Sequence, residues 1–291
     1  MRKYLASFIF FNFIVWHVFA TSTPISIQIN ELKANAEIVE VEDKEKPFFI
    51  ILHGSFAWHG MELPQTVQNL LAEEGMGSIA FTLTLGENDR QGFFDCSHPI
   101  LGGHDDALVE IDRWIDKANQ MGYKNVHLIA HSRGGAQVAL YSNSNPSKIN
   151  SISLIAPLVW DKQRTEKQYL ASANKTLPSL IAKAKNTKTN SNLINTHVLH
   201  CGQTKISPMA FISYYDETIQ KNTPTLLQNI EVRTRIYLGD EDSVTSAFMD
   251  QKLVFKDNPH ISIKMIEDAD HFFRDFAADD LVSDIIEHID K

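Results

Sequence analysis

Short apolar runs alternate with amphipathic stretches through most of the 291 residues, and this order predicts an α/β fold. The continuous apolar run at 48–52 is typical of a strand that is buried on both faces of a sheet, and 126–130 is predicted to be another buried strand. Further strands are predicted at 78–85, 152–156, 235–238 and 261–266, with one or two edge strands within 25–42. Helices are predicted at 62–74, at 105–120, from 134 onward and at 276–288. This alternation implies a mostly parallel central sheet with helices on both faces.

The alternation stops over residues 158–230, which contain no strand-like pattern. We predict helices at 164–172 and 177–187 and irregular structure elsewhere in this stretch. So long a segment exceeds an ordinary connection between two elements. We therefore predict a helical lid or cap insertion over the carboxyl edge of the sheet, where open α/β sheets bind their ligands.

The first twenty residues have the layout of a secretory signal peptide. Arg2 and Lys3 precede an apolar run at 5–15, and small and polar residues follow Ala20. The alternative is a retained membrane anchor, but the run is shorter than the roughly 20 residues that a membrane-spanning helix needs. We predict cleavage after Ala20, a mature domain at 21–291 without a stable membrane anchor, and a secreted or periplasmic location.

Charge and cysteine content limit the possible partners. The formal charge is −9, and signal removal leaves 25 basic against 36 acidic residues, a charge of −11. Nucleic-acid binding is not expected, because it requires a basic face. In an exported protein, Cys96 and Cys201 favour a disulfide that joins the loop before residue 103 to the insertion, with two buried thiols as the alternative. No zinc-type spacing supports a metal site.

Residues Ala130-His131-Ser132-Arg133-Gly134-Gly135 follow a predicted buried strand and open a predicted helix. A serine on such a sharp turn needs small residues around it, because the turn brings backbone segments close together. The turn exposes the hydroxyl at the sheet edge. The helix N-terminus behind it supplies N–H groups that favour a developing oxyanion, the first from Arg133.

This segment resembles the nucleophile elbow of the α/β-hydrolase superfamily, in which the first residue is usually glycine. Ala130 departs from that pattern, as the corresponding residue does in some members that resemble bacterial lipases. The resemblance implies an α/β-hydrolase fold, Ser132 as nucleophile, and an acid and a histidine that follow in that chain order. It implies no metal and no organic cofactor.

Two later segments match this order. Gly239-Asp240-Glu241-Asp242 follows a predicted strand, and the family-like spacing favours Asp242 as the acid, with Asp240 as the alternative. His271 follows the last predicted strand, where the resemblance places the general base. The alternative is that His271 is an ordinary surface histidine at the start of a helix.

A second oxyanion donor is expected in the loop after the strand at 48–52. That loop begins His53-Gly54-Ser55-Phe56, which resembles the His-Gly oxyanion motif of the superfamily. The backbone N–H of Ser55 is the first candidate and that of Phe56 the second.

Together these residues predict an exported serine hydrolase that cleaves carboxylic esters, or amides and peptides, through an acyl-enzyme. A small-molecule ester or amide is the expected partner. Two alternatives remain open: a non-catalytic ligand-binding protein on a hydrolase scaffold, and an envelope acyltransferase that uses the same three residues.

Overall fold

The structure is a computed structural model that describes residues 21–187, 189 and 191–289. The predicted signal peptide, residues 1–20, lies outside the described residues, so cleavage after Ala20 stays a prediction. Within the described part of the chain, no helix combines the length and apolarity needed to cross a membrane.

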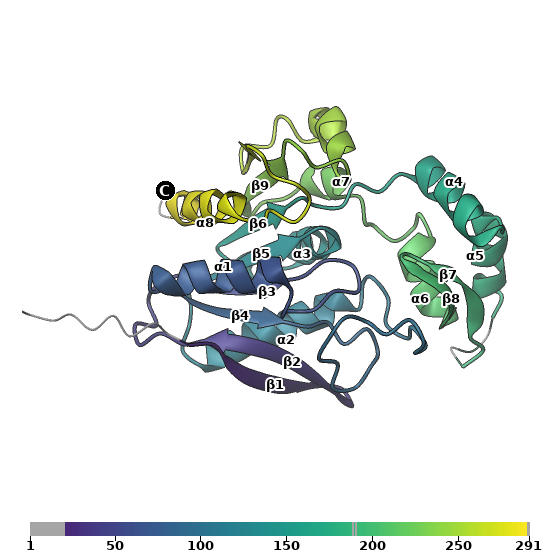
Figure 1. Cartoon of the computed structure of the whole chain (residues 1–291), viewed down its shortest axis with the longest axis horizontal. Helices are drawn as coiled ribbons and strands as arrows, with labels where there is room; N and C mark the ends of the chain where they lie inside the picture. The colour runs from purple at the N-terminus through teal and green to yellow at the C-terminus, as the bar shows by residue number, and fades with distance from the viewer. Residues whose placement is uncertain (1–20, 188, 190, 290–291) are drawn as a thin grey trace, which may run out of the picture.

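An eight-stranded sheet in the order β1-β2-β4-β3-β5-β6-β9-β10 forms the centre of the molecule (Figure 1). The strands from β4 to β10 in this order run parallel, whereas β1 and β2 pair antiparallel at one edge. The strands are β1 (Thr23–Ile29), β2 (Leu32–Val39), β3 (Phe48–Leu52), β4 (Gly77–Phe81), β5 (Val126–His131), β6 (Ser151–Ile155), β9 (Arg233–Gly239) and β10 (Ile261–Ile266). The predicted mostly parallel sheet is confirmed.

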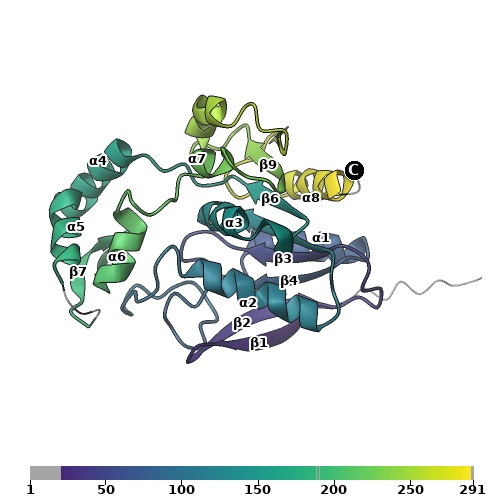
Figure 2. The ribbon, with the colours of Figure 1, turned by 180° about the vertical axis from the view of Figure 1, so that it is seen from behind.

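Helices cover both faces of the sheet (Figure 2). On one face lie α1 (Glu62–Glu73) and α8 (Phe276–Ile289), and on the other lie α2 (Ala107–Gln120) and α3 (Arg133–Ser144). Alternate side chains of β3 enter two separate apolar clusters, with Phe48 in one and Phe49 in the other. A strand buried on both faces reads as a continuous apolar run for this reason.

Strand β4 is shorter than predicted, since it ends at Phe81 rather than at residue 85. Leu83 and Leu85 are buried, which explains their apolar character. Just beyond Phe81, the N–H of Thr82 still donates to the carbonyl of Asn35 on β2, but side chains bind the next two N–H groups. The N–H of Leu83 donates to Nε2 of His53, and the N–H of Thr84 donates to Glu110. Such side-chain partners allow the chain to leave the sheet without burying unpaired backbone groups.

The insertion between β6 and β9 projects to one side of the sheet (Figures 1 and 2). The projecting elements are α4 (Lys162–Ala173), α5 (Leu177–Lys185), β7 (Ile194–Val198), β8 (Cys201–Ile206) and α6 (Pro208–Tyr215). The last helix of the insertion, α7 (Thr223–Leu227), lies beside β9 (Figures 1 and 2). The described chain also contains 3-10 helices at Pro146–Lys148 and Ser246–Val254.

The prediction that the insertion contains no strand was wrong, because β7 and β8 pair as an antiparallel hairpin. The buried positions of β7 alternate as in other strands, but one of them is the polar Thr196. Its hydroxyl is satisfied by the hydroxyl of Tyr169 at 2.6 Å. That contact comes from α4 and is not visible in a local hydrophobic pattern.

The predicted disulfide between Cys96 and Cys201 is present. It joins the loop after β4 to the first residue of β8. Neighbouring bonds support the same junction, since Thr204 donates to the carbonyl of Cys96 and the N–H of Ile100 donates to the carbonyl of Lys205. The loop and the insertion are therefore held together covalently and by hydrogen bonds.

We expect the variant Cys96→Ser/Cys201→Ser to lose about 3–5 kcal/mol of unfolding free energy, because the bond closes a long loop in the unfolded chain. The two cysteines are 105 residues apart in sequence. Urea unfolding of wild type and variant, each with and without dithiothreitol, measures the difference. Reduction should destabilise wild type by a similar amount and leave the variant unchanged. Equal stability of wild type and variant would contradict the prediction.

Candidate active site

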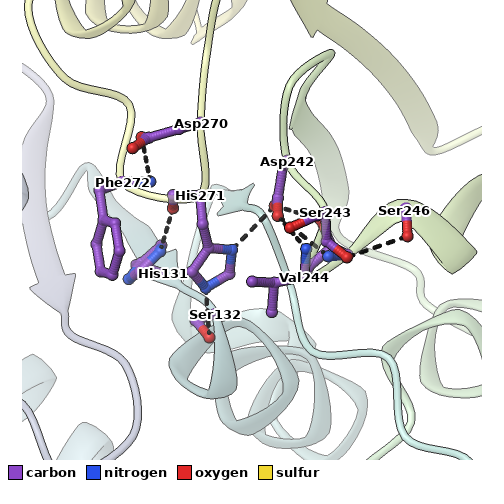
Figure 3. Close-up of polar contacts among 10 residues, drawn as sticks. His131, Ser132, Asp242, Ser243, Val244, Ser246, Asp270, His271 and Phe272 are labelled. Atoms are coloured by element: carbon purple, nitrogen blue, oxygen red, sulfur yellow. Dashed lines mark hydrogen bonds and ion pairs between the residues drawn. The ribbon is translucent and has the colours of Figure 1, made fainter.

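Three loops meet at the carboxyl edge of the parallel strands and bring Ser132, Asp242 and His271 together (Figure 3). Ser132 follows β5, Asp242 follows β9 and His271 follows β10. Nε2 of His271 lies 3.2 Å from Oγ of Ser132, and its Nδ1 lies 2.9 Å from Oδ2 of Asp242. The side chains thus form a continuous hydrogen-bonded chain from a hydroxyl through an imidazole to a carboxylate.

Ser132 occupies a strained turn between β5 and α3, with φ 54° and ψ −119°. The turn is closely packed on two sides. A Cβ atom at Gly134 would lie 2.5 Å from the carbonyl oxygen of His53, and one at Gly54 would lie 3.2 Å from Cβ of Ser132. A larger side chain at Gly134 would therefore collide with backbone, which explains the small residue in the motif. Strain of this kind persists where the surrounding structure enforces it.

His131, the residue before Ser132, positions the loop that carries His271. Its Nε2 donates to the backbone carbonyl of His271 at 2.8 Å, and the two rings lie 4.8 Å apart (Figure 3). Burial, together with the neighbouring His271, lowers the pKa of His131 to about 4. A neutral His131 adds no positive charge beside the base. The sequence analysis missed this role because the contact joins residues 140 apart.

Asp242 is 5% exposed and has four hydrogen-bond donors around its carboxylate. Oδ1 accepts from the N–H groups of Val244 and Thr245, and Oδ2 accepts from the Thr245 hydroxyl and from His271. Burial alone would raise the pKa of Asp242, but the bonds from His271 and Thr245 outweigh it and lower the pKa to about 2. The alternative acid, Asp240, is exposed, and no bond joins it to His271 in the described structure.

The loop after β3 is held by two buried side chains that the sequence analysis did not single out. Nδ1 of His53 donates to the carbonyl of Gly54 at 2.8 Å, since its Nε2 accepts from the N–H of Leu83. Burial and the nearby charge of Arg90 lower the pKa of His53 well below its usual value. Arg90 donates to the carbonyls of Ala57 and Leu83. These contacts fix the loop that faces Ser132.

Glu110 on α2 supports the same region, since its buried carboxylate accepts from the N–H and hydroxyl of Thr84. Burial raises its pKa from 4.5 to about 7, although the bonds from Thr84 partly oppose the shift. The native state therefore binds more protons than the unfolded chain between these pH values.

We expect this carboxyl group to make the unfolding free energy fall as pH rises through that window. The contribution is complete below pH 4.5 and is lost by about pH 7. Its size is about 3 kcal/mol from the usual conversion of a pKa shift. Denaturant unfolding of wild type and Glu110→Gln at intervals from pH 4 to pH 8 measures it. Parallel pH curves for the two proteins would contradict the prediction.

The two candidate oxyanion residues differ in surroundings. Oγ of Ser55 accepts from Nε of Arg133 at 2.9 Å, which joins the loop to the first residue of α3. Phe56 has φ 54° and a fully buried ring, and its carbonyl accepts from the N–H of Phe94. The structure thus brings the segments of both expected donors, at Ser55 and Arg133, next to each other beside Ser132.

The sequence model of the α/β hydrolase fold matches residues 47–277. The chain belongs to the α/β-hydrolase fold family. The match spans the six parallel strands from β3 to β10 of the central sheet, the insertion and all three residues of the hydrogen-bonded chain, so the family resemblance drawn from the sequence is confirmed. Comparison with curated protein sequences gives no match.

Solved structures with the same fold cover nearly the whole chain at low identity. Est1E from Butyrivibrio proteoclasticus is 16% identical with a TM-score of 0.63, over 92% of this chain and 99% of that one. The monoacylglycerol lipase of Paleococcus ferrophilus is 18% identical with a TM-score of 0.59, over 88% and 98%. Mouse alpha/beta hydrolase domain-containing protein 10 is 16% identical with a TM-score of 0.63, over 92% and 98%. At these identities the likeness establishes the fold.

A cavity of about 360 Å³ lies between the insertion of this α/β-hydrolase and the first residue of α3. Its wall includes Arg133, residues 158–160 after β6, and side chains of α4 and α6. The N–H of Leu158 donates to the carbonyl of Ser132 at 3.0 Å, which places this wall beside the serine turn. Arg133, the residue directly after Ser132, is the part of the serine turn that lines the cavity, whereas Ser132, Asp242 and His271 are not among its lining residues.

One group of side chains in the described chain has metal-like composition, namely Cys96, His200 and Cys201. Both sulfurs are joined to each other in the disulfide. Cysteine ligates a metal ion as a thiolate, and two cysteines joined in a disulfide offer no thiolate. The group therefore does not fit a resident metal while the bond is intact.

Proposed function

We propose that the chain is a serine hydrolase that cleaves small-molecule carboxylic esters or amides through an acyl-enzyme on Ser132. The observation that carries this proposal is the hydrogen-bonded chain from Ser132 through His271 to Asp242. A serine hydroxyl is a weak nucleophile at neutral pH and needs a base that a third group orients. The carboxylate of Asp242 holds Nδ1 of His271 protonated, which leaves Nε2 free to accept the serine proton.

In the first half of the reaction, Oγ of Ser132 attacks the carbonyl carbon while its proton moves to Nε2 of His271. The carbonyl oxygen becomes an oxyanion, for which we propose the N–H groups of Arg133 and Ser55 as donors. Ser55 is favoured over Phe56 because it directly follows Gly54, the loop residue packed against Ser132. The tetrahedral intermediate collapses, and His271 returns the proton to the departing alcohol or amine.

In the second half, water takes the place of the departed alcohol. His271 removes a proton from the water while its oxygen attacks the acyl carbon. The new intermediate collapses to a free acid, and the proton returns from His271 to Oγ of Ser132. His131 and Asp242 hold the imidazole in place throughout, one through the backbone and the other through Nδ1.

The substrate class rests on the cavity and on the fold neighbours. A volume of about 360 Å³ suits a small molecule rather than a polymer. A structure of Est1E contains bound ferulic acid, and another neighbour is a monoacylglycerol lipase. Both support a small carbonyl compound as the substrate of this chain.

The decisive experiment is labelling with a fluorophosphonate probe, which reacts with activated serines. We expect wild type to be labelled at Ser132, as located by peptide mass spectrometry, and Ser132→Ala to remain unlabelled. Ser243→Ala is the matched control, since this serine lies beside Asp242 and should not affect labelling. A folded wild type that resists the probe would favour a non-catalytic binding protein on the same scaffold.

We also infer that the protein acts in a secreted or periplasmic compartment. The disulfide supports this inference, because such bonds persist in oxidising compartments and are rare in the cytosol.

A further inference from the structure

The side chain of Arg133 is the feature of the cavity that the proposed reaction does not use. Arg133 is 7% exposed and lines the cavity wall. Nε donates to Ser55, and the guanidinium lies 5.4 Å from the ring centre of Tyr214. Nη1 is shielded from solvent and has no hydrogen-bond partner among the described residues. Buried cations are normally paired, since an unpaired one loses its hydration without compensation.

The surroundings of Arg133 offer no anion to pair with it. The described residues that line the cavity include Arg133 and Arg164 but no aspartate or glutamate. The guanidinium of Arg164 on α4 donates to the backbone carbonyl of Val159, and the backbone N–H of Arg164 donates to Asp161. This basic lining contrasts with the acidic chain as a whole, whose formal charge is −9.

Lys221 is a further basic group close to the cavity, and its Nζ donates to the carbonyls of Asp216 and Ile219. Lys221 is 1% exposed and places Nζ 4.8 Å over the ring of Trp160, which also lines the cavity. Asp216 is paired with Lys185, and Asp105 accepts from Ser213. Each of these acids has a partner within the protein, and neither lines the cavity.

We propose that the cavity binds a free carboxylate on the substrate, so that Ser132 cleaves small esters or amides that carry a second, anionic group. The guanidinium of Arg133 lines the cavity without an ion-pair partner among the described residues, and a planar guanidinium binds a carboxylate through two parallel hydrogen bonds. The aromatic walls from Tyr169, Tyr214 and Tyr215 suit the apolar part that joins the carboxylate to the scissile bond. This inference rests on the proposed function, since it names the substrate class of the same site.

Two pairs of matched substrates test the inference on wild type. Mono-(4-nitrophenyl) adipate and its terminal amide place the charge on the acyl side. The corresponding pair for the alcohol side is 4-acetoxybenzoate and 4-acetoxybenzamide. We expect kcat/KM for the acid to exceed that for the amide by about tenfold or more in at least one pair, as for a hydrogen bond to a charged group. An equal or lower value for the acid in both pairs overturns the inference.

Substitutions of Arg133 and Arg164 test whether these arginines cause the preference for the acid over the amide. Arg133→Met and Arg164→Gln should each lower the acid-to-amide ratio of kcat/KM, by at least about tenfold and threefold respectively. The ratio cancels any general effect of Arg133→Met on catalysis. Arg113→Gln, at an exposed position on α2, should leave the ratio unchanged. If Arg133→Met fails to fold, the acid-to-amide ratio of Arg164→Gln, a variant at an exposed position, tests the inference by itself. A wild-type ratio retained in the folded variants overturns the inference.

Labelling with the fluorophosphonate probe distinguishes failure of the carboxylate-site inference from failure of the proposed hydrolase function. A wild type that is labelled at Ser132 but shows no acid preference retains the proposed function and loses the carboxylate site. A folded wild type that is not labelled loses both.

Discussion

Replacing His271 by alanine is expected to lower kcat for ester hydrolysis by about 10⁴- to 10⁶-fold, the range found when the base of such a triad is removed. Nε2 of His271 is 3.2 Å from Oγ of Ser132, and it is the imidazole nitrogen bonded to that hydroxyl. Without it the serine proton has no acceptor at neutral pH. The residual rate then reflects binding and the oxyanion donors alone.

His260→Ala is the matched control for this variant. His260 is exposed and lies just before β10, at the opposite end of the strand from His271. Its loss should change kcat by less than about twofold, as for most surface substitutions. Steady-state kinetics on one activated ester, with circular dichroism of each variant, provide the comparison. Retention of more than a tenth of wild-type kcat by folded His271→Ala would remove His271 from the mechanism.

Asp242→Asn should lower kcat by about 10⁴-fold, whereas Asp240→Asn should leave it within about threefold of wild type. The amide keeps the shape of the side chain but does not stabilise an imidazolium, and its NH₂ group favours the wrong tautomer of His271. Asp240 is exposed and directs its backbone N–H to the carbonyl of Ile266. The pair therefore compares two acids in one turn, of which the structure joins only Asp242 to His271.

The pH dependence provides a second test of this assignment. Because the pKa of Asp242 is lowered to about 2, its carboxylate is ionised throughout the range in which esterases are assayed. The activity of wild type should accordingly show no step between pH 5 and pH 8 that arises from the titration of Asp242. The ionised carboxylate of Asp242 should also stabilise the folded state, fully above pH 3.8 and progressively less as pH falls towards 2. A large loss of activity in Asp240→Asn instead would transfer the role to that residue.

The local pattern of apolar and polar residues was sufficient to predict the strands of the sheet domain but not those of the insertion. Strand β3 could be predicted at its observed bounds because burial on both faces requires an apolar residue at every position. The hairpin of β7 and β8 could not, because Thr196 occupies a buried position and depends on Tyr169 of another helix. The end of β4 was misplaced for a related reason, since side chains of His53 and Glu110 take over its backbone bonds.

The sequence by itself determined the order of the strands and helices of the sheet domain, the serine turn between β5 and α3, and the chain order of serine, acid and histidine. These features depend on residues that are neighbours in the chain, so local sterics and hydrophobic periodicity specify them. The tertiary structure decided which acid meets His271, that His131 supports it, and that the guanidinium of Arg133 is buried without an anion. Those contacts join loops that are far apart in sequence, and only the packing of parallel strands at a common edge brings them within hydrogen-bond distance.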